Sequence, residues 1–227
     1  MYLQDLVISL YALLTVQSQT AQQVQLLPQS PRLEVLASQS YSLKNRYQTE
    51  SVNTVFADNI LLTLSYMSGT TKMGEKVDWE KVRQPNRFHF VLEPGKSFAF
   101  HDQVIKEYQD SVVQTTNAHF IWDEGFKSDG WLVGDGVCHL ASFINVVAQE
   151  AGLEVTAPTR HDFATIPDVE KSFGTSIYFM PGDANLSSKQ NLYVKNNTSK
   201  PIALVFEHTS DHQLNLEVDT VSAGETR

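Results

Sequence analysis

One strongly apolar helix, preceded by two glycines, constrains the fold of this chain more than any other feature. The residues from Val137 to Ala151 are mostly apolar, and the segment Gly134-Asp135-Gly136 comes directly before them. Gly152 is well placed to end the helix, because glycine readily adopts the left-handed conformation found at helix ends. A helix this apolar has to be covered by other parts of the chain. We therefore expect a central helix inside the domain.

A polar stripe interrupts the apolar helix. Cys138, Ser142, Asn145 and Gln149 recur at helical spacing, so they share one face. Cys138 is the only cysteine of the chain and falls in the first helical turn. Free backbone N–H groups and the positive end of the helix dipole favour a thiolate at that place. Cys138 is therefore a candidate nucleophile, although free cysteines are also common as small buried apolar residues.

Composition narrows the class of protein. The chain has 227 residues, of which 41% are hydrophobic and 19% charged, enough for one domain with its own core. Its net charge of −9 argues against nucleic acid as a partner, because binding to phosphates needs clustered Lys and Arg. A single cysteine excludes an intramolecular disulfide framework and a cysteine-rich zinc site. No familiar metal-ligand spacing connects His139, His161 and Asp162, so we expect neither a metal nor another cofactor.

The N-terminal part predicts an exported protein. The apolar run 6–16 is short for a membrane span and suits the core of a signal peptide, although no Lys or Arg precedes it. An anchor remnant or a first buried helix stays open. The location that we expect is extracytoplasmic, with membrane contact only through this segment. The expected organisation is a signal peptide or anchor remnant at 1–18, a linker rich in Gln, Ser and Pro at 19–40, a folded domain at 41–220 and a tail at 221–227.

The remaining periodicities predict a single α+β domain, in which the cysteine-bearing helix packs on mostly antiparallel short strands. Helical spacing from Val52 to Met67 predicts a core helix capped by Ser51, and Asp78 is a candidate cap for a short helical turn. Two strand pairs are expected to form hairpins. They are 87–92 with 97–101, around a turn at 93–96, and 191–195 with 202–207. Further expected elements are a helix at 103–110, an extended segment at 112–122 and strands at 154–156, 177–180 and 213–218.

Five segments in order resemble motifs of the VanW family, the accessory proteins named after a vancomycin-resistance cluster. They are Glu93–His101, Gly134–Ser142, Gly152–Val155, Pro181–Ala184 and Asn196–Ile202, and the resemblance covers roughly residues 50 to 207. His139 stands where the family usually has Gln, and Phe143 where it usually has Ser or Thr. The resemblance implies a bacterial cell-envelope accessory protein, for which the family has no agreed reaction.

The order of cysteine, histidine and aspartate also resembles transglutaminase-like and papain-like enzymes. In that arrangement Cys138 is the nucleophile, His161 the base and Asp183 the carboxylate that orients the imidazole. Asp162 is a competing partner for the imidazole, and His139 is a competing base. The ordinary alternatives are an exposed histidine loop and a turn aspartate. Candidates for substrate binding or for stabilising an oxyanion are His139, Ser142 and Gly136, although Ser142 could simply bond back to a helix carbonyl.

Three functions stay open. The first is a cysteine-dependent acyl-transfer or amidase-like enzyme acting on cell-wall peptides. The second is a non-catalytic envelope module that binds peptidoglycan, as peptide or glycan, or a partner protein. The third is a structural exported domain in which the polar stripe packs on backbone. One or two of the three tryptophans, Trp79, Trp122 and Trp131, are candidates for lining a groove. The other histidines, His89, His101, His119, His208 and His212, are expected to be structural or exposed.

Overall fold

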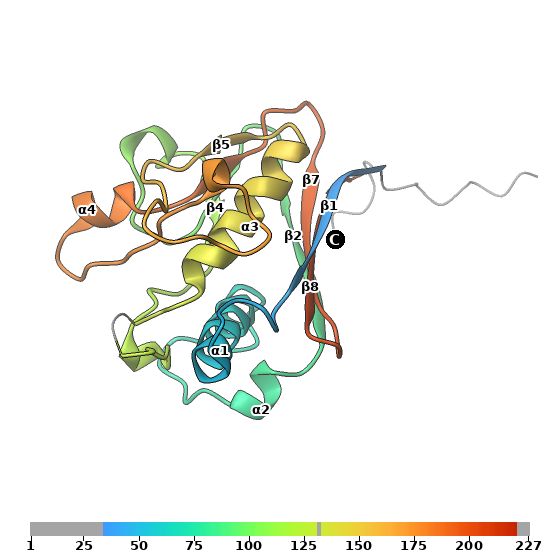
Figure 1. Cartoon of the computed structure of the whole chain (residues 1–227). Coiled ribbons are helices and arrows are strands. Elements are labelled where there is room, and N and C mark those ends of the chain that lie inside the picture. The colour runs from blue at the N-terminus through green and yellow to red at the C-terminus, as the bar shows by residue number, and fades with distance from the viewer. Residues whose placement is uncertain (1–33, 131–132, 222–227) are drawn as a thin grey trace, which may run out of the picture. The chain divides into compact units, whose positions relative to one another are not determined.

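Two four-stranded sheets organise the part of the chain that the computed structural model describes, residues 34–130 and 133–221 (Figure 1). The first sheet is antiparallel throughout. Its order is β1 (Glu34–Ser42), β8 (Gln213–Thr220), β7 (Ile202–His208) and β2 (Asn86–Leu92). The second sheet has the order β4 (Val112–Gln114), β3 (Ser97–Ala99), β6 (Tyr193–Lys195) and β5 (Glu154–Thr156), and only β3 and β4 are parallel.

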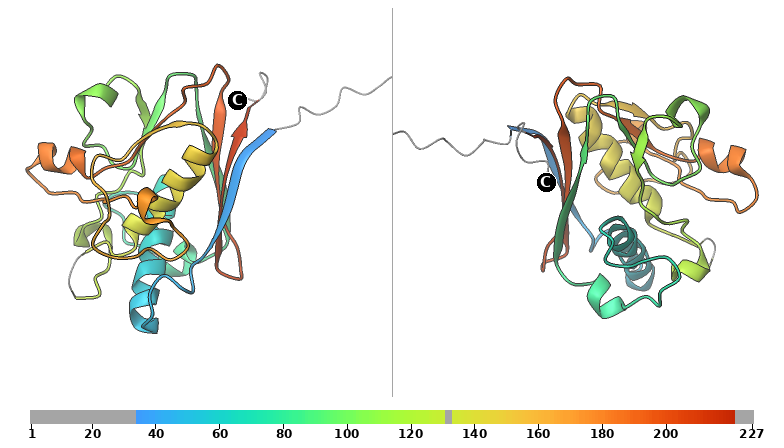
Figure 2. Two further views of the ribbon diagram at one scale, coloured as in Figure 1. Left: turned by 45° about the horizontal axis from the view of Figure 1, so that its top comes forward. Right: turned by 180° about the vertical axis from the view of Figure 1, so that it is seen from behind.

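The helix that carries the cysteine lies at the centre, as predicted. The helices are α1 (Glu50–Met67), α2 (Trp79–Val82), α3 (Val137–Glu150) and α4 (Ala184–Lys189), with short 3-10 turns at Lys106–Tyr108, Trp122–Glu124 and Lys171–Phe173. Helix α3 contacts β1 and β8 of the first sheet, β5 of the second sheet and α1. Figure 2 shows α1 and α3 on the same face of the first sheet. Phe143 of α3 is fully buried and stacks on Tyr41 of β1, with 3.8 Å between ring centroids. The fold is therefore the predicted α+β domain.

None of the helices in the described ranges is long and apolar enough to cross a membrane. The apolar run 6–16 and the predicted tail, except for Val221, lie outside the described residues. The likeness to papain-like and transglutaminase-like folds stays a prediction. Strand β1 starts at Glu34, within the segment predicted as a linker, because its backbone pairs with β8 from Glu34 to Ser42.

The two predicted hairpins are wrong, although their strands exist. Residues 86–99 and 193–208 instead run antiparallel to each other as one long ribbon, pairing β2 with β7 and then β3 with β6. The ribbon bends between these pairs and so contributes strands to both sheets. Asn196 is fully buried at the bend. Its side-chain amide donates to the carbonyl oxygens of Leu92 and Lys200, both at 2.8 Å.

Several expected elements are shorter than predicted, and the remaining residues of these segments form loops. The helix expected at 103–110 is only the 3-10 turn Lys106–Tyr108, and the extended segment 112–122 is a strand only in β4. The strand expected at 177–180 has no regular structure. Helix α4 is not among the expected elements, because the Pro-Gly pair before Asp183 is typical of a turn. Parts of the segments 112–122 and 177–180 line two of the cavities described below.

Candidate functional site

Helix α3 begins where only glycine fits. Gly136 caps the helix with a φ of 96°, and a Cβ at this position would lie 2.5 Å from the carbonyl oxygen of Phe56. Glycine removes both the backbone strain and the clash. Gly136 therefore lets the backbone of α1 approach the first turn of α3, which is a packing role; its predicted part in substrate binding stays a prediction.

Cys138 is held by backbone groups of one residue. The Ile177 N–H donates to Sγ at 3.4 Å, and the thiol donates to the Ile177 carbonyl oxygen at 3.6 Å. Burial raises the pKa of the Cys138 thiol to about 11, and the nearby charge of Asp135 raises it further, against the lowering effect of the hydrogen bond from Ile177. Desolvation outweighs the helix-dipole effect expected from the sequence. The thiol is therefore protonated at neutral pH.

Ser142 and Asn145 of the polar stripe bind residues 173–175. Ser142 Oγ donates to the Cys138 carbonyl at 2.7 Å and accepts from the Thr175 N–H at 2.9 Å. The amide of Asn145 donates to the Phe173 carbonyl at 2.9 Å. Ser142 is fully buried, so both its bonds lie inside the protein. These bonds fix a loop against α3. A polar stripe packed on backbone is also the arrangement expected for the third function considered above, a structural domain.

The two histidines near α3 form a buried pair. His139 and His161 are both 5% exposed, and their ring centroids lie 6.4 Å apart. Neither Nδ1 atom has a hydrogen-bond partner. Burial lowers the pKa of both rings; for His139, where the charges of Arg46 and His161 add to the effect, the pKa falls to about 3. Both imidazoles are therefore neutral across the physiological range.

Asp183 caps helix α4. It lies on the surface, and its Oδ1 accepts the Leu186 N–H at 2.9 Å, which caps α4. Among the described hydrogen bonds, none joins Cys138, His161 and Asp183 to one another. The catalytic roles assigned to these three residues from the sequence stay predictions.

Two cavities share His119 as a lining residue, and we call them the polar lobe and the aromatic lobe of one groove. The polar lobe is a cavity of about 380 Å³, and the side chains used below are Lys72, Asp102, Thr115, Asn117 and His119. The aromatic lobe is a cavity of about 310 Å³ whose lining includes His119, Trp122, Gly134, Val137, Tyr178 and Phe179. His119 lines both lobes, so the two cavities are neighbours at this residue.

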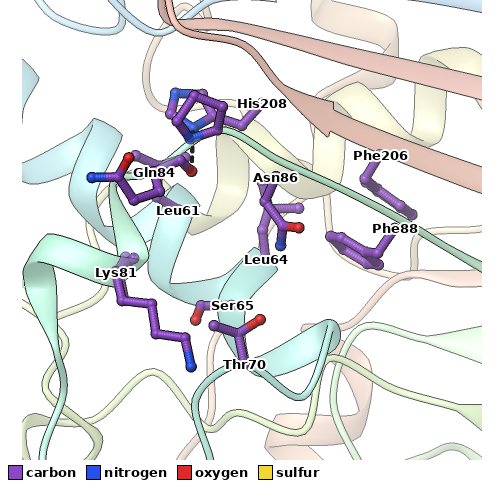
Figure 3. A pocket seen from close by; sticks show the side chains of 12 residues that line it. Leu61, Leu64, Ser65, Thr70, Lys81, Gln84, Asn86, Phe88, Phe206 and His208 are labelled. Atoms are coloured by element: carbon purple, nitrogen blue, oxygen red, sulfur yellow. Dashed lines mark hydrogen bonds between the residues drawn. The ribbon is translucent and has the colours of Figure 1, made fainter.

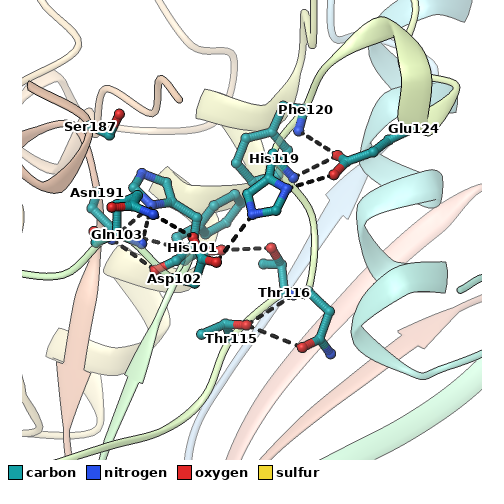
Figure 4. Close-up of polar contacts among 12 residues, drawn as sticks. His101, Asp102, Gln103, Thr115, Thr116, His119, Phe120, Glu124, Ser187 and Asn191 are labelled. Carbon is teal, nitrogen blue, oxygen red and sulfur yellow. Dashed lines mark hydrogen bonds and ion pairs between the residues drawn. The ribbon is translucent and has the colours of Figure 1, made fainter. Parts of the chain in front are cut away.

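His119 is oriented by a buried carboxylate (Figure 4). Glu124 is 4% exposed. Its Oε2 accepts the backbone N–H groups of His119 at 2.6 Å and Phe120 at 3.0 Å, and its Oε1 lies 2.8 Å from His119 Nδ1. The Nε2 atom of the ring lies 3.2 Å from Asp102 Oδ2. Because a carboxylate only accepts, Nδ1 carries the proton toward Glu124. Asp102 is also a carboxylate, so Nε2 donates to it in this arrangement, and Nε2 becomes an acceptor only in a neutral ring that Asp102 Oδ2 no longer contacts.

The loop that carries His119 has left-handed backbone on both sides of this residue, and Phe120 is the strained position. Asn117 and Phe120 have φ values of 59° and 62°, a region that costs a bulky L-residue about 1–3 kcal/mol. The Phe120 ring is 6% exposed and packs near Phe100 and Phe126. This packing and the Glu124 bonds keep the loop in the strained conformation. Strain of this kind concentrates at functional sites.

A smaller cavity of about 200 Å³ lies between α1 and the first sheet (Figure 3). Its walls are mostly apolar and include Leu61, Leu64, Phe88 and Phe206. At one end His208 Nδ1 faces the Gln84 carbonyl oxygen at 3.2 Å. Among the described residues, the lining of this cavity includes no carboxylate that could pair with an imidazole as Glu124 pairs with His119. We therefore place the candidate site in the groove.

The sequence predicted Trp122 as a candidate for lining a groove, but it did not predict the pair of His119 and Glu124. Trp122, predicted as a candidate for lining a groove, does so and is 64% exposed. Trp79 instead packs against Lys127, whose Nζ lies 3.9 Å from the ring centroid, and Trp131 lies outside the described residues. His119 had been expected to be structural or exposed. Nothing in the spacing of His119 and Glu124 indicates that they form a pair, because an irregular loop brings them together.

Comparison with known proteins gives one result. A family model described as "VanW like protein" matches residues 87–218. The matched range contains the groove loop, helix α3 and both halves of the bent ribbon. No curated protein and no solved structure matches the chain.

Proposed function

Because the chain belongs to the VanW-like protein family, we propose that it is an exported cell-envelope protein whose groove binds a cell-wall peptide or glycan. Membership of the family supports an association with the envelope, and the signal-peptide pattern at 1–18 supports export. Cell fractionation checks the location: recovery of the protein in the cytoplasm alone would contradict it.

The observation that carries this proposal is the exposed aromatic surface at one end of a groove whose other end is polar. Trp122 and Tyr178 are 64% and 38% exposed and line the same lobe. Large aromatic side chains left open to solvent in a cavity favour a ligand with flat apolar faces, such as a sugar ring. A glycan unit fits this end of the groove.

The polar lobe fits a peptide. Lys72 and Asp102 give it one charge of each sign, and Thr115 and Asn117 add side chains that both donate and accept hydrogen bonds. Peptides with a free carboxylate and a free amine carry the complementary pair of charges. A cell-wall fragment that joins a sugar to a short peptide would therefore occupy both lobes.

The cysteine-dependent alternative receives less support. A nucleophilic cysteine has to be a thiolate, whereas burial raises the pKa of Cys138 to about 11 and both contacts of its sulfur are to Ile177. For this reason the proposal rests on the groove and not on the thiol.

Binding is tested with insoluble peptidoglycan and with soluble muropeptides. The full-length protein should co-sediment with purified sacculi, and calorimetry should give a dissociation constant for a disaccharide-peptide. Replacing Trp122 by Ala should weaken binding roughly tenfold or more, about 1.4 kcal/mol, because a stacking surface is lost.

Phe163→Ala is the matched control. Phe163 is also an exposed aromatic residue, 74% exposed, but it lines neither lobe. Its removal should leave affinity unchanged. If the wild-type protein fails to bind both sacculi and muropeptides, the proposed function is wrong; if both substitutions weaken binding equally, the groove is not the site.

A further inference from the structure

We propose that the groove is also a hydrolytic site, in which His119 acts as a general base and cleaves an amide bond of the bound cell-wall peptide with water. This inference rests on the proposed function, because it requires the peptide to lie in the groove. It assigns the chemistry to a residue pair, His119 and Glu124, other than the cysteine-centred triad expected from the sequence.

The first argument is the orientation of the imidazole. Glu124 is buried and fixed by two backbone N–H groups, and its other oxygen lies 2.8 Å from His119 Nδ1. A carboxylate in this position sets the tautomer and stabilises the imidazolium that forms when the ring takes a proton. In the neutral ring the lone pair of Nε2 points away from Glu124, toward the place that Asp102 Oδ2 now occupies, and His119 lines both lobes of the groove.

The second argument is the place of this pair along the groove. A ligand that fills both lobes lies against His119, since this residue lines each of them. Asp102 now lies 3.2 Å from Nε2, but its side chain is 55% exposed. An exposed carboxylate can turn toward solvent at little cost. A water molecule or the scissile bond can then take its place beside Nε2.

The third argument is electrostatic. Gly134 and Val137, on either side of the residue that caps α3, line the aromatic lobe together with His119. The N-terminus of a helix carries a partial positive charge. The carbonyl oxygen of a bound amide becomes negative when water adds to its carbon, and a helix N-terminus close to it favours that state. A base and a positive helix end thus share one cavity.

The reaction balances with water as the only co-reactant. His119 Nε2 takes one proton from water while the water oxygen forms a bond to the amide carbon. The bond from that carbon to nitrogen then breaks, and the leaving nitrogen takes the proton held by His119. The products are a carboxylic acid and an amine, and the imidazole returns to its neutral form.

The test uses the full-length protein and purified disaccharide-peptides, with products separated by chromatography and weighed by mass spectrometry. The wild-type protein should convert one muropeptide into two fragments whose masses sum to the substrate plus one water. His119→Gln should lower the rate at least about 100-fold, the usual contribution of a general base, while calorimetry shows affinity within about twofold.

Three further variants separate a chemical role from a structural one. Glu124→Gln should lower kcat and change its pH profile, with KM little altered, because Glu124 positions His119 without contacting the substrate. His89→Gln is the matched control, since His89 is exposed on β2 and lines neither lobe. Cys138→Ser should retain the hydrolytic rate.

The possible results are distinct. Binding without hydrolysis by the wild-type protein overturns this inference and leaves the proposed function intact, whereas absence of binding removes both. Hydrolysis that survives His119→Gln overturns the role of His119. Hydrolysis that is lost in Cys138→Ser but kept in His119→Gln assigns the reaction to the thiol.

Discussion

At the scale of single residues, desolvation decides the chemistry of the only cysteine. The position of Cys138 in the first turn of α3 favours a thiolate, but burial acts in the opposite direction and raises the pKa of the thiol to about 11. The two buried histidines nearby follow the same rule, since burial lowers the pKa of His139 and His161. The sequence indicates that Cys138 lies in the first turn of a helix, but it does not show that the thiol is desolvated.

The raised pKa predicts slow alkylation of Cys138. Below the pKa the thiolate fraction rises about tenfold per pH unit, so the rate of labelling by iodoacetamide should climb steadily to pH 9 without a plateau. At pH 7 the rate should be roughly 100-fold below that of an unperturbed cysteine, and His161→Ala should leave it unchanged. The measurement is clean because the chain has no second thiol. A plateau near neutral pH that His161→Ala abolishes would restore the cysteine-dependent enzyme.

At the scale of elements, the bent ribbon connects the two sheets through one buried side chain. Besides its bonds to Leu92 and Lys200, Asn196 accepts the backbone N–H of Thr198 at 2.9 Å. The backbones of the two turns are also joined, since Gly95 N–H donates to the Asn196 carbonyl and Asn196 N–H donates to the Lys96 carbonyl. The bend is therefore fixed by hydrogen bonds between segments about 100 residues apart in sequence.

Removing the Asn196 side chain should destabilise the domain. Asn196→Ala removes three hydrogen bonds to backbone groups, one of them to the carbonyl of the fully buried Leu92. Each bond contributes about 0.5–1.5 kcal/mol and a buried unsatisfied group costs about 1–3 kcal/mol, so we expect a loss of about 2–4 kcal/mol in the free energy of unfolding. Urea denaturation followed by tryptophan fluorescence measures it. The neighbouring Asn197 is exposed, so Asn197→Ala should change stability by less than about 0.5 kcal/mol. Equal effects of the two substitutions would show that the buried amide does not fix the bend.

The ribbon also shows where sequence patterns stop being sufficient. Local periodicity correctly predicted α1, α3 and strands β2 and β7, because each carries its own apolar repeat. It could not predict which strands pair, since Gly95 and Asn196 look like ordinary hairpin turns. The pairing of His119 with Glu124 was hidden for a different reason, since these residues are only five positions apart. It depends on left-handed backbone at Asn117 and Phe120, which no propensity favours at phenylalanine.

At the scale of the whole described molecule, several imidazoles are buried in the neutral form. Burial lowers the pKa of His101 to about 4 and of His139 to about 3, and it also lowers the pKa of His161 and His208. In the unfolded chain these rings titrate near their ordinary value of about 6.5. Below that value the unfolded state binds more protons than the folded state, so acid favours unfolding.

Two carboxyl groups act in the opposite direction over part of this range. Burial raises the pKa of Asp135 and of Asp219 to about 6, so the folded state keeps these protons between about pH 4 and 6 and gains stability there as the pH falls. The loss of stability caused by the four histidines is larger than the gain from the two aspartates. Below about pH 4 the aspartates are protonated in both states, and the loss of stability continues until His139 is protonated.

The free energy of unfolding should therefore fall as the pH is lowered from about 6.5 to 3. Part of this loss should come from His139 and should disappear when this residue is replaced. A fully buried histidine of lowered pKa contributes about 1.4 kcal/mol per pH unit once the unfolded ring is protonated. Urea midpoints measured at pH 7, 6, 5 and 4 give the slope. Gln is the residue that the related family usually has at this position, so His139→Gln should fold and should flatten the curve below pH 6. His89→Gln, at an exposed site on β2, should leave the slope unchanged. Equal slopes in the wild-type protein and His139→Gln would mean that the buried pair does not govern acid unfolding, and the loss would then belong to the remaining histidines or to the carboxylates.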